Sequence, residues 1–194
     1  MTDFDATTAL VVVDCQNDFT DPEGSLFVPG SEAVIDEVNR HVAAAVAAGS
    51  PVIYTQDWHP PSTPHFEKDG GIWPVHCVAG SWGAEFHPGL VVGGPTIRKG
   101  SNGEDGYSGF TMRDPESGAD TPTELHSMLQ AHGASQLVVV GVALDYCVKG
   151  TALDGLELGY SVTMPLEATA AVNLQPSDGA AAAEEAAEAG ATVV

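Results

Sequence analysis

The stretch TTALVVVDCQNDF, residues 7–19, contains an unbroken apolar run that ends on a carboxylate. The run from Ala9 to Val13 is rich in β-branched residues and has no polar face, which is typical of a central parallel strand covered on both sides. Asp14 follows it directly. Because ligands bind beyond the carboxyl ends of parallel strands, the residues that close such strands are the first candidates for chemistry. This stretch therefore predicts a parallel sheet with a functional edge that includes Asp14.

Strand-like and helix-like segments alternate along the rest of the chain. Ser31–Ala48 has helical spacing, with Ser31 as the predicted N-cap and Gly49 as the predicted C-cap. The alternation predicts an α/β fold with three layers, α/β/α, around a mostly parallel, roughly six-stranded sheet of Rossmann-like type. Further strands are predicted at residues 50–57, 95–100, 135–143, 160–168 and 191–194, and further helices at 121–132, 146–159 and 177–189.

The length of the chain favours a single domain. Its 194 residues and 20.0 kDa suffice for one substantial hydrophobic core but not for two comfortable ones. We therefore predict one domain over residues 1–194. Within it, a loop-rich insertion at about 58–95 contains many Gly, Pro and Trp residues. Loops of that length in a compact domain usually carry function, so the insertion is expected to contribute to a site.

The charge balance excludes several classes of partner. The formal net charge is -21, from 27 acidic residues against six Lys and Arg, so the surface repels nucleic acid and anionic membranes. No apolar stretch approaches the roughly 20 residues that span a bilayer, and no basic region precedes an apolar run near Met1. We expect a soluble, cytoplasmic protein whose partner is a small molecule, and the sequence leaves open whether it forms a homo-oligomer.

Three cysteines in such a chain do not suggest a disulfide framework. Each thiol therefore needs another explanation, which is packing, metal ligation or catalysis. Cys77 is expected to pack. Cys147 is a stronger candidate for chemistry because of its place in the predicted fold.

Polar or reactive side chains close four of the predicted strands. Asp14, Asp57 and Lys99 each follow a strand-like run, and the segment GVALDYC, residues 141–147, follows the run LVVV. The carboxyl ends of parallel strands lie at one edge of the sheet, so we expect these groups to converge there. Two acids, a lysine and a cysteine would then share one site.

Cys147 lies where a predicted strand passes into a predicted helix. Unpaired backbone N–H groups and the helix dipole favour a thiolate at such a junction, although an isolated free cysteine is more often a packed core residue. A cysteine nucleophile also needs a base within hydrogen-bond reach. Asp14 can accept the thiol proton if burial raises its pKa, and Lys99 can orient the pair and balance its charge. Taken singly, each of these two residues is more often structural.

QDWHPPSTPHF, residues 56–66, has the composition of a metal site. Asp57 and His59 are two positions apart, so they project to the same side of an extended chain. His65 and His76 follow in the same loop-rich insertion. Imidazole nitrogens with a carboxylate suit Zn, Fe or Mn, whereas the alternative reading is a polar surface loop whose prolines merely stiffen it. No role is predicted for the other histidines, of which His41 and His132 are expected on helix surfaces, His87 in a loop and His126 in a helix.

Five motifs, in this order and at these intervals, resemble those of one family. They are VVVDCQNDF (11–19), DWHPPSTPHF (57–66), WPVHCV (73–78), RKG (98–100) and GVALDYCV (141–148). Together they are similar to the isochorismatase-like cysteine hydrolases and, within these, to the nicotinamidase (pyrazinamidase) branch. The resemblance covers nearly the whole chain. It implies an isochorismatase-like domain that acts in NAD salvage.

The resemblance also implies a mechanism. Asp14, Lys99 and Cys147 match the family's catalytic triad, which hydrolyses nicotinamide to nicotinate and ammonia through a cysteine thioester. The backbone N–H groups of Ala143 and Cys147 would form the oxyanion hole, and the peptide bond between Val142 and Ala143 is expected to be cis.

The metal and substrate sites can be placed in the same way. Asp57, His59 and His76 match the ligands of one divalent transition metal (Zn, Fe or Mn), which would bind the pyridine nitrogen of the substrate. His65 matches a fourth ligand that only some members have. Aromatic residues that match the walls of the substrate pocket are Phe19, Trp73 and Tyr107, and Tyr146 is expected to limit substrate scope.

Three alternatives remain open from the sequence. Another amidase of the superfamily, acting on a ureido or carbamoyl substrate, would not need His59 and His76. A catalytically silent ligand-binding member would be expected to have lost a triad residue, and none is missing. A histidine-dependent cysteine protease is disfavoured, since no histidine closes a strand opposite Cys147. The acidic segment 100–120 also departs from the family pattern and is expected to act as an altered lid.

Overall fold

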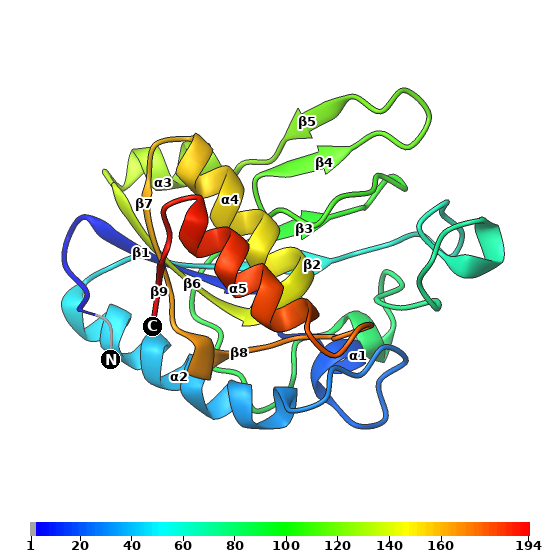
Figure 1. Ribbon diagram of the computed structural model, residues 1–194, viewed down its shortest axis with the longest axis horizontal. Coiled ribbons are helices and arrows are strands. Elements are labelled where there is room, and N and C mark those ends of the chain that lie inside the picture. Colours follow the sequence, from blue (N-terminus) through cyan, green and yellow to red (C-terminus); the bar gives the residue numbers. More distant parts are fainter. Residues whose placement is uncertain (1–2) are drawn as a thin grey trace.

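A parallel sheet forms the centre of the protein, whose computed structural model describes residues 3–194 (Figure 1). Its strand order is β3-β2-β1-β6-β7-β9, with β8 paired to β6 off this path, and all of these pairings are parallel. The predicted fold class is thereby confirmed. The strands are β1 (Thr8–Val13), β2 (Val52–Asp57), β3 (Thr96–Lys99), β6 (Gln136–Val142), β7 (Ser161–Met164), β8 (Thr169–Ala170) and β9 (Thr192–Val193), and the helices are α1 (Asn17–Thr20), α2 (Ser31–Ala48), α3 (Leu125–Ala131), α4 (Lys149–Glu157) and α5 (Asp178–Glu188).

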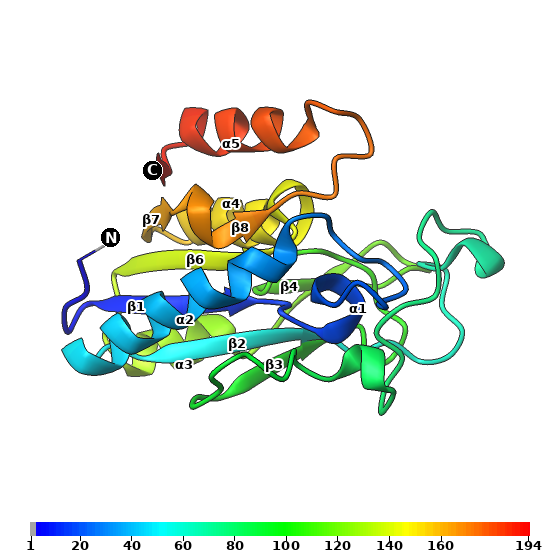
Figure 2. The same ribbon diagram turned by 90° about the horizontal axis from the view of Figure 1, so that it is seen from below.

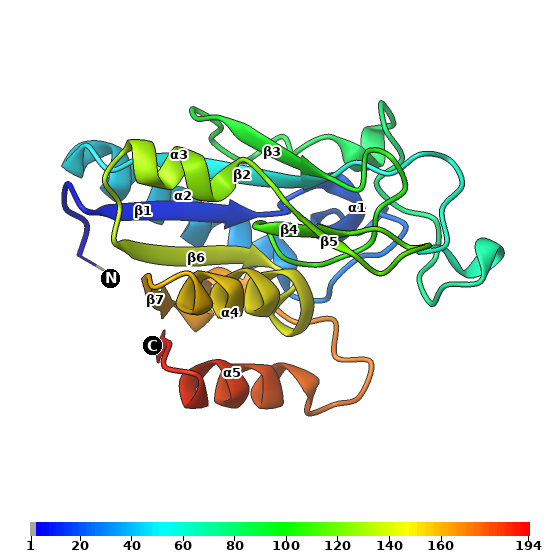
Figure 3. The ribbon, with the colours of Figure 1, turned by 90° about the horizontal axis from the view of Figure 1, so that it is seen from above.

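Alternate side chains of the central strand β1 enter two different cores. Leu10 and Val12 pack in the core under α2, whereas Val11 and Val13 pack in the core under α3 and α4. Figure 2 shows α2 in front of the sheet, and the opposite view in Figure 3 shows α3 and α4 in front of it. The continuous apolar run of β1 is explained by these two cores, because a strand buried on both faces has no side on which to place a polar residue.

The functional edge is set by the register of the strands. Asp57, the last residue of β2, lies beside Lys99, the last residue of β3. In the same way Val13 at the end of β1 lies beside Gly141 of β6. The segment between β2 and β3 extends beyond this edge (Figure 1) and contains two short 3-10 turns, Glu67–Asp69 and Trp82–Ala84.

Two predicted elements are wrong at their ends. The helix predicted over 121–132 begins only at Leu125, because Asp120–Pro122 forms a strand, β5, that pairs antiparallel with β4 (Thr111–Arg113). The strand predicted over 160–168 ends at Met164. Pro165 follows it, and because proline has no N–H to donate to a ladder, the chain turns there.

Two predictions about helix α2 are also corrected. Gly30, not Ser31, is the N-cap, and the hydroxyl of Ser31 instead donates to the carbonyl oxygen of Phe19 at 3.0 Å. His41, expected on the surface of this helix, is only 3% exposed and belongs to its buried side. Gly49 is confirmed as the C-cap. Over residues 3–194, no helix combines the length and apolar character needed to cross a bilayer.

Candidate active site and metal centre

Lys99 is the central residue of the site. Its side chain is only 2% exposed, and its Nζ atom lies 2.8 Å from Oδ2 of Asp14 and 3.0 Å from Oδ1 of Asp57. The same atom lies 3.5 Å from Sγ of Cys147 and 3.1 Å from the carbonyl oxygen of Tyr107. The carboxylates, the thiol and the ammonium group that close the strands therefore meet at one point, as the strand-end argument predicted.

The Asp14 carboxylate is fully buried and held from two sides. Thr55 Oγ1 donates to Asp14 Oδ1 at 2.6 Å, while Lys99 contacts the other carboxylate oxygen. Burial raises the pKa of Asp14, although the charge of Lys99 counteracts part of that rise. A carboxylate with a raised pKa is suited to take up a proton and to give it back.

Cys147 lies in a π-helical turn, Leu144–Val148, that precedes α4. Burial raises the pKa of its thiol well above the usual value; Lys99 counteracts this rise and Asp14 adds to it. The sequence predicted a thiolate at a junction between a strand and a helix. Cys147 does lie at such a junction, between β6 and α4. The predicted ionisation is corrected, because the buried surroundings favour the protonated thiol. The peptide bond between Val142 and Ala143 is cis, as the resemblance implied.

Three buried histidines gather beside Asp57. One ring nitrogen from each of His59, His65 and His76 lies within 4.8 Å of the others. Oδ2 of Asp57 is 3.8 Å from Nε2 of His59 and 3.8 Å from Nε2 of His76. The His76 ring is oriented by its Nδ1 atom, which lies 2.8 Å from the carbonyl oxygen of Pro74. Imidazoles with one carboxylate are the donor set that Zn, Fe and Mn prefer.

His59 supplies the test of whether a cation fits here. Both of its ring nitrogens are buried, and neither has a hydrogen-bond partner within residues 3–194. Buried polar atoms are nearly always satisfied, so an imidazole with two unsatisfied nitrogens fits a bound metal ion. Burial lowers the pKa of His76 to about 4, which keeps that ring neutral and able to ligate at neutral pH.

Asp57 keeps its negative charge despite complete burial. Burial alone would raise its pKa, but the charge of Lys99 and the nearby imidazole of His59 bring the pKa well below its usual value. Asp57 thus faces the lysine with one oxygen and the histidines with the other. It links the thiol–acid–lysine group to the candidate metal centre.

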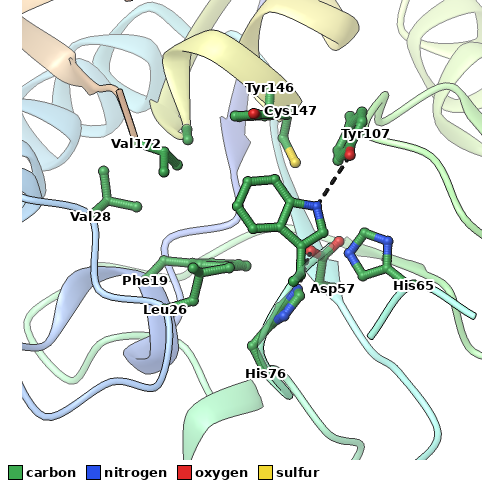
Figure 4. Close-up of a pocket in the computed structure, with 12 residues that line it drawn as sticks. Phe19, Leu26, Val28, Asp57, His65, His76, Tyr107, Tyr146, Cys147 and Val172 are labelled. Carbon is green, nitrogen blue, oxygen red and sulfur yellow. Dashed lines mark hydrogen bonds and ion pairs between the residues drawn. The ribbon is translucent and has the colours of Figure 1, made fainter. Parts of the chain in front are cut away.

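A cavity opens next to both groups (Figure 4). Its lining residues include Ala143, Cys147, Asp57, His65 and His76. Asp14, Lys99 and His59 are not among the lining residues. All four residues predicted to bind substrate are in the wall, namely Phe19, Trp73, Tyr107 and Tyr146.

The aromatic side chains of the wall contact one another. Nε1 of Trp73 donates to Oη of Tyr107 at 3.2 Å, and the ring of Trp73 lies edge-on to that of Tyr146 at a centroid distance of 4.8 Å. Three apolar residues complete the wall, and the sequence did not predict them because nothing distinguishes them from core residues: Leu26, Val28 and Val172.

Sequence reasoning also missed the side chains that hold the candidate ligands. Gln16 accepts from the N–H of Asp57 at 2.8 Å and donates to the carbonyl oxygen of Asp57 at 2.7 Å. Asp18 accepts from the N–H of Cys77 at 2.7 Å and thereby holds the loop segment next to His76. Both lie in the motif that follows β1, which was the available signal. Cys77 itself is buried, with its Sγ 3.8 Å from the carbonyl oxygen of Gly83.

A parallel α/β sheet that joins a thiol, an ammonium group and a carboxylate below an aromatic cavity is the architecture of a hydrolytic enzyme. Known proteins agree with this class. The model of the isochorismatase domain matches residues 8–194. The nicotinamidase of Escherichia coli (strain K12) is 38% identical over 203 residues, covering 95% of this chain and 93% of that protein.

Two solved structures are similar over nearly their whole length. PnC1 from L. infantum in complex with nicotinate superposes with a TM-score of 0.87 at 37% identity, covering 100% of this chain and 95% of that one. The pyrazinamidase of Pyrococcus horikoshii in complex with zinc gives a TM-score of 0.85 at 35% identity, with 97% and 98% covered. The chain belongs to the isochorismatase family. Its full-length similarity to nicotinamidases identifies it as an amidohydrolase.

Proposed function

We propose that this protein is a metal-dependent nicotinamidase, which hydrolyses nicotinamide to nicotinate and ammonia and so serves NAD salvage. One observation carries the proposal. Lys99 Nζ contacts Asp14, Asp57 and Cys147 at once, so a buried thiol–acid pair is joined directly to a cluster of metal-ligating side chains. The nicotinamidases and the zinc-bound pyrazinamidase described above support the choice of substrate and cofactor.

The cavity fits a flat aromatic amide. Phe19, Trp73 and Tyr107 offer ring surfaces, and π-faces stack favourably on a heteroaromatic ring. The carboxamide would lie against Cys147. A divalent transition metal held by Asp57, His59 and His76, with His65 as a fourth ligand, would supply a Lewis-acidic position for the ring nitrogen of the substrate.

The reaction then follows from the protonation states of the site. Sγ of Cys147 attacks the amide carbon while its proton passes to Asp14, whose raised pKa suits it to accept. The backbone N–H groups of Ala143 and Cys147 would stabilise the oxyanion. Asp14 returns the proton to the departing nitrogen, the C–N bond breaks, and ammonia leaves a thioester on Cys147. Asp14 next takes a proton from water as the water oxygen attacks the thioester carbon. The C–S bond breaks, Asp14 returns this proton to Sγ of Cys147, and the acid leaves and ionises to nicotinate.

Lys99 has two roles in this reaction. Its positive charge lets two buried carboxylates, Asp14 and Asp57, stay side by side. It also compensates the negative charge that develops as the thiol proton moves away. The ureido and carbamoyl alternatives need a thiol–acid–lysine group but not the three-histidine cluster, so this cluster favours the nicotinamidase reading. The retained triad speaks against a silent ligand-binding member.

The proposal is tested by ammonia release from a panel of aromatic and ureido amides, with enzyme that has been stripped of metal and reloaded with Zn, Fe or Mn. Nicotinamide should be the best substrate, and stripping should abolish turnover until metal is returned. Cys147→Ala should have no activity, whereas Cys15→Ala, which removes a buried thiol outside the cavity wall, should keep it. Hydroxylamine should divert product to nicotinohydroxamate if a thioester forms. Full activity without metal, or in Cys147→Ala, would refute the proposal.

A further inference from the structure

Asp105 contacts His65, one of the three clustered histidines. Its Oδ1 atom lies 2.7 Å from Nδ1 of His65, and the His65 side chain is 6% exposed whereas that of Asp105 is 44% exposed. A carboxylate oxygen accepts and an imidazole N–H donates, so this short contact makes Nδ1 of His65 the donor. Asp105 comes from the acidic segment 100–120, and neither its type nor its position in the sequence predicted a role.

The Asp105 carboxylate is held in place by its own backbone surroundings. The N–H of Asp105 donates to the carbonyl oxygen of Arg113 at 2.7 Å, and the N–H of Arg113 donates back at 2.5 Å. The N–H of Gly106 donates to the same Oδ1 atom at 2.8 Å. A further hydrogen bond joins the loop that follows β2 to the segment that follows β3: Thr63 Oγ1 donates to the carbonyl oxygen of Gly103 at 3.1 Å. Strand β4 therefore positions the carboxylate that meets His65.

The hydrogen bond determines which nitrogen of His65 is free. A neutral imidazole carries one N–H and one lone pair, so a donating Nδ1 leaves the lone pair on Nε2. His65 lines the cavity beside Asp57 (Figure 4), and its ring stacks on that of His59 at a centroid distance of 4.9 Å. His76 is arranged likewise through its contact with Pro74. His59 has no such outer partner among the described residues.

We propose that Asp105 is a positioning residue that fixes the ring orientation and tautomer of His65, so that Nε2 of His65 completes the metal centre as a fourth ligand. This rests on the proposed function, since it presumes a bound metal. A carboxylate behind a ligating histidine restricts the ring and makes it a stronger donor. Asp105 would act through His65 alone and would not touch the metal or the substrate.

The first test measures zinc affinity by competition with a chromophoric chelator. Removing such an outer partner typically weakens metal binding about 10- to 100-fold, and this is the loss expected for Asp105→Ala. Asp105→Asn, whose amide oxygen can still accept from Nδ1, should lose less. Glu116→Ala removes an exposed carboxylate from the same segment and should bind zinc like the wild type. Equal zinc affinity in Asp105→Ala and the wild type would overturn the proposal.

A double variant separates positioning from a general effect of charge. If Asp105 acts through His65, then Asp105→Ala should weaken zinc binding no further once His65→Ala is present. An undiminished effect in the His65→Ala background would contradict the proposal. Circular dichroism and thermal unfolding of each variant show whether the fold is retained.

A spectroscopic readout needs no metal. Long-range ¹H–¹⁵N correlation spectra of the metal-free protein should show His65 as the Nδ1–H tautomer, and Asp105→Ala should shift it towards a mixture. A mixed tautomer already in the wild type would refute the proposal. These outcomes are separable from failure of the proposed function, which would appear as a wild-type enzyme that neither binds zinc nor releases ammonia. A zinc-dependent wild type with an unaffected Asp105→Ala variant refutes only the role of Asp105.

Discussion

The carboxylate of Asp14 and the ammonium group of Lys99 form an ion pair at 2.8 Å, with side chains that are 0% and 2% exposed. Both charges are buried, so each depends on the other for compensation. Removing one member of a buried ion pair is far more costly than removing an exposed one, because an uncompensated charge stays behind. Here the cost is increased by Asp57, a second buried carboxylate that Lys99 also contacts.

Lys99→Met should therefore lower the free energy of unfolding by about 3–5 kcal/mol at neutral pH and abolish ammonia release. The loss is expected because Asp14 and Asp57 would remain buried without a cation. Urea unfolding followed by circular dichroism measures it. Lys149→Met is the matched control: its ion pair with Glu185 is partly exposed, and about 1 kcal/mol or less should be lost. Similar small losses in both variants would contradict the buried-pair argument.

Gly100 leaves room for His59, whose two ring nitrogens have no hydrogen-bond partner among the described residues. A Cβ atom at this position would lie 2.5 Å from Nδ1 of His59, and the φ of Gly100 is +77°. Gly103 has a comparable φ of +89°, but its Cβ would have no neighbour nearer than 4.0 Å. The two glycines thus share backbone strain and differ in what a side chain would meet.

Gly100→Ala should weaken zinc binding at least tenfold, whereas Gly103→Ala should leave it near the wild-type value. Both should lose about 1–2 kcal/mol of stability, because alanine is disfavoured at positive φ. Chelator competition and urea unfolding give the two quantities separately. Comparable zinc affinities in the two variants would show that displacement of His59 does not matter.

The sequence predicted the residues that close the long strands, and the structure brings Asp14, Asp57, Lys99 and Cys147 together. This worked because a buried parallel strand has an unmistakable apolar pattern, and its end fixes where the next residue lies. The contact between Asp105 and His65 could not be found in that way. It depends on the backbone bridge between Asp105 and Arg113 of β4, a three-residue strand with exposed or half-exposed side chains and no apolar pattern.

Two other features were not predicted because they also depend on contacts between residues that are distant in the sequence. Gln16 reaches Asp57 across 41 positions of the chain, and a neutral amide gives no sign in the sequence of which backbone groups it will satisfy. The thiol of Cys147 was expected to ionise at a helix start. Its burial next to Asp14 depends on the packing of several elements, and that sets the direction of its pKa shift.

Trp73 should contribute mainly to substrate binding. Its ring is 4% exposed in the cavity wall, and its N–H donates to Tyr107. Trp73→Ala should raise the KM for nicotinamide by about tenfold or more, since an aromatic contact is worth about 0.5–1.5 kcal/mol beyond the area that it buries. Tyr107→Phe keeps its ring and loses one hydrogen bond of about 1 kcal/mol, so a smaller rise is expected. Steady-state kinetics measure both. A fall in kcat with unchanged KM in Trp73→Ala would contradict a role of Trp73 in substrate binding.

His41 gives a pH dependence that is independent of the active site. Its side chain is 3% exposed, its Nδ1 has no hydrogen-bond partner in the described chain, and Nε2 lies 4.0 Å from Glu167. Burial lowers the pKa of His41 below the usual value of 6.5. As the pH falls through 6.5, the unfolded chain binds a proton that the folded chain does not, so the free energy of unfolding decreases.

His41→Leu removes the titrating group and replaces it with an apolar, helix-forming side chain of similar size. The stability of the variant relative to the wild type should therefore rise steadily as the pH is lowered from 7.5 to 5, because only the wild type loses this contribution. Urea unfolding of both proteins at several pH values gives the difference and cancels the titration of the shared carboxylates and histidines. A difference that stays constant over this range would mean that His41 binds its proton equally well in the folded and unfolded chains.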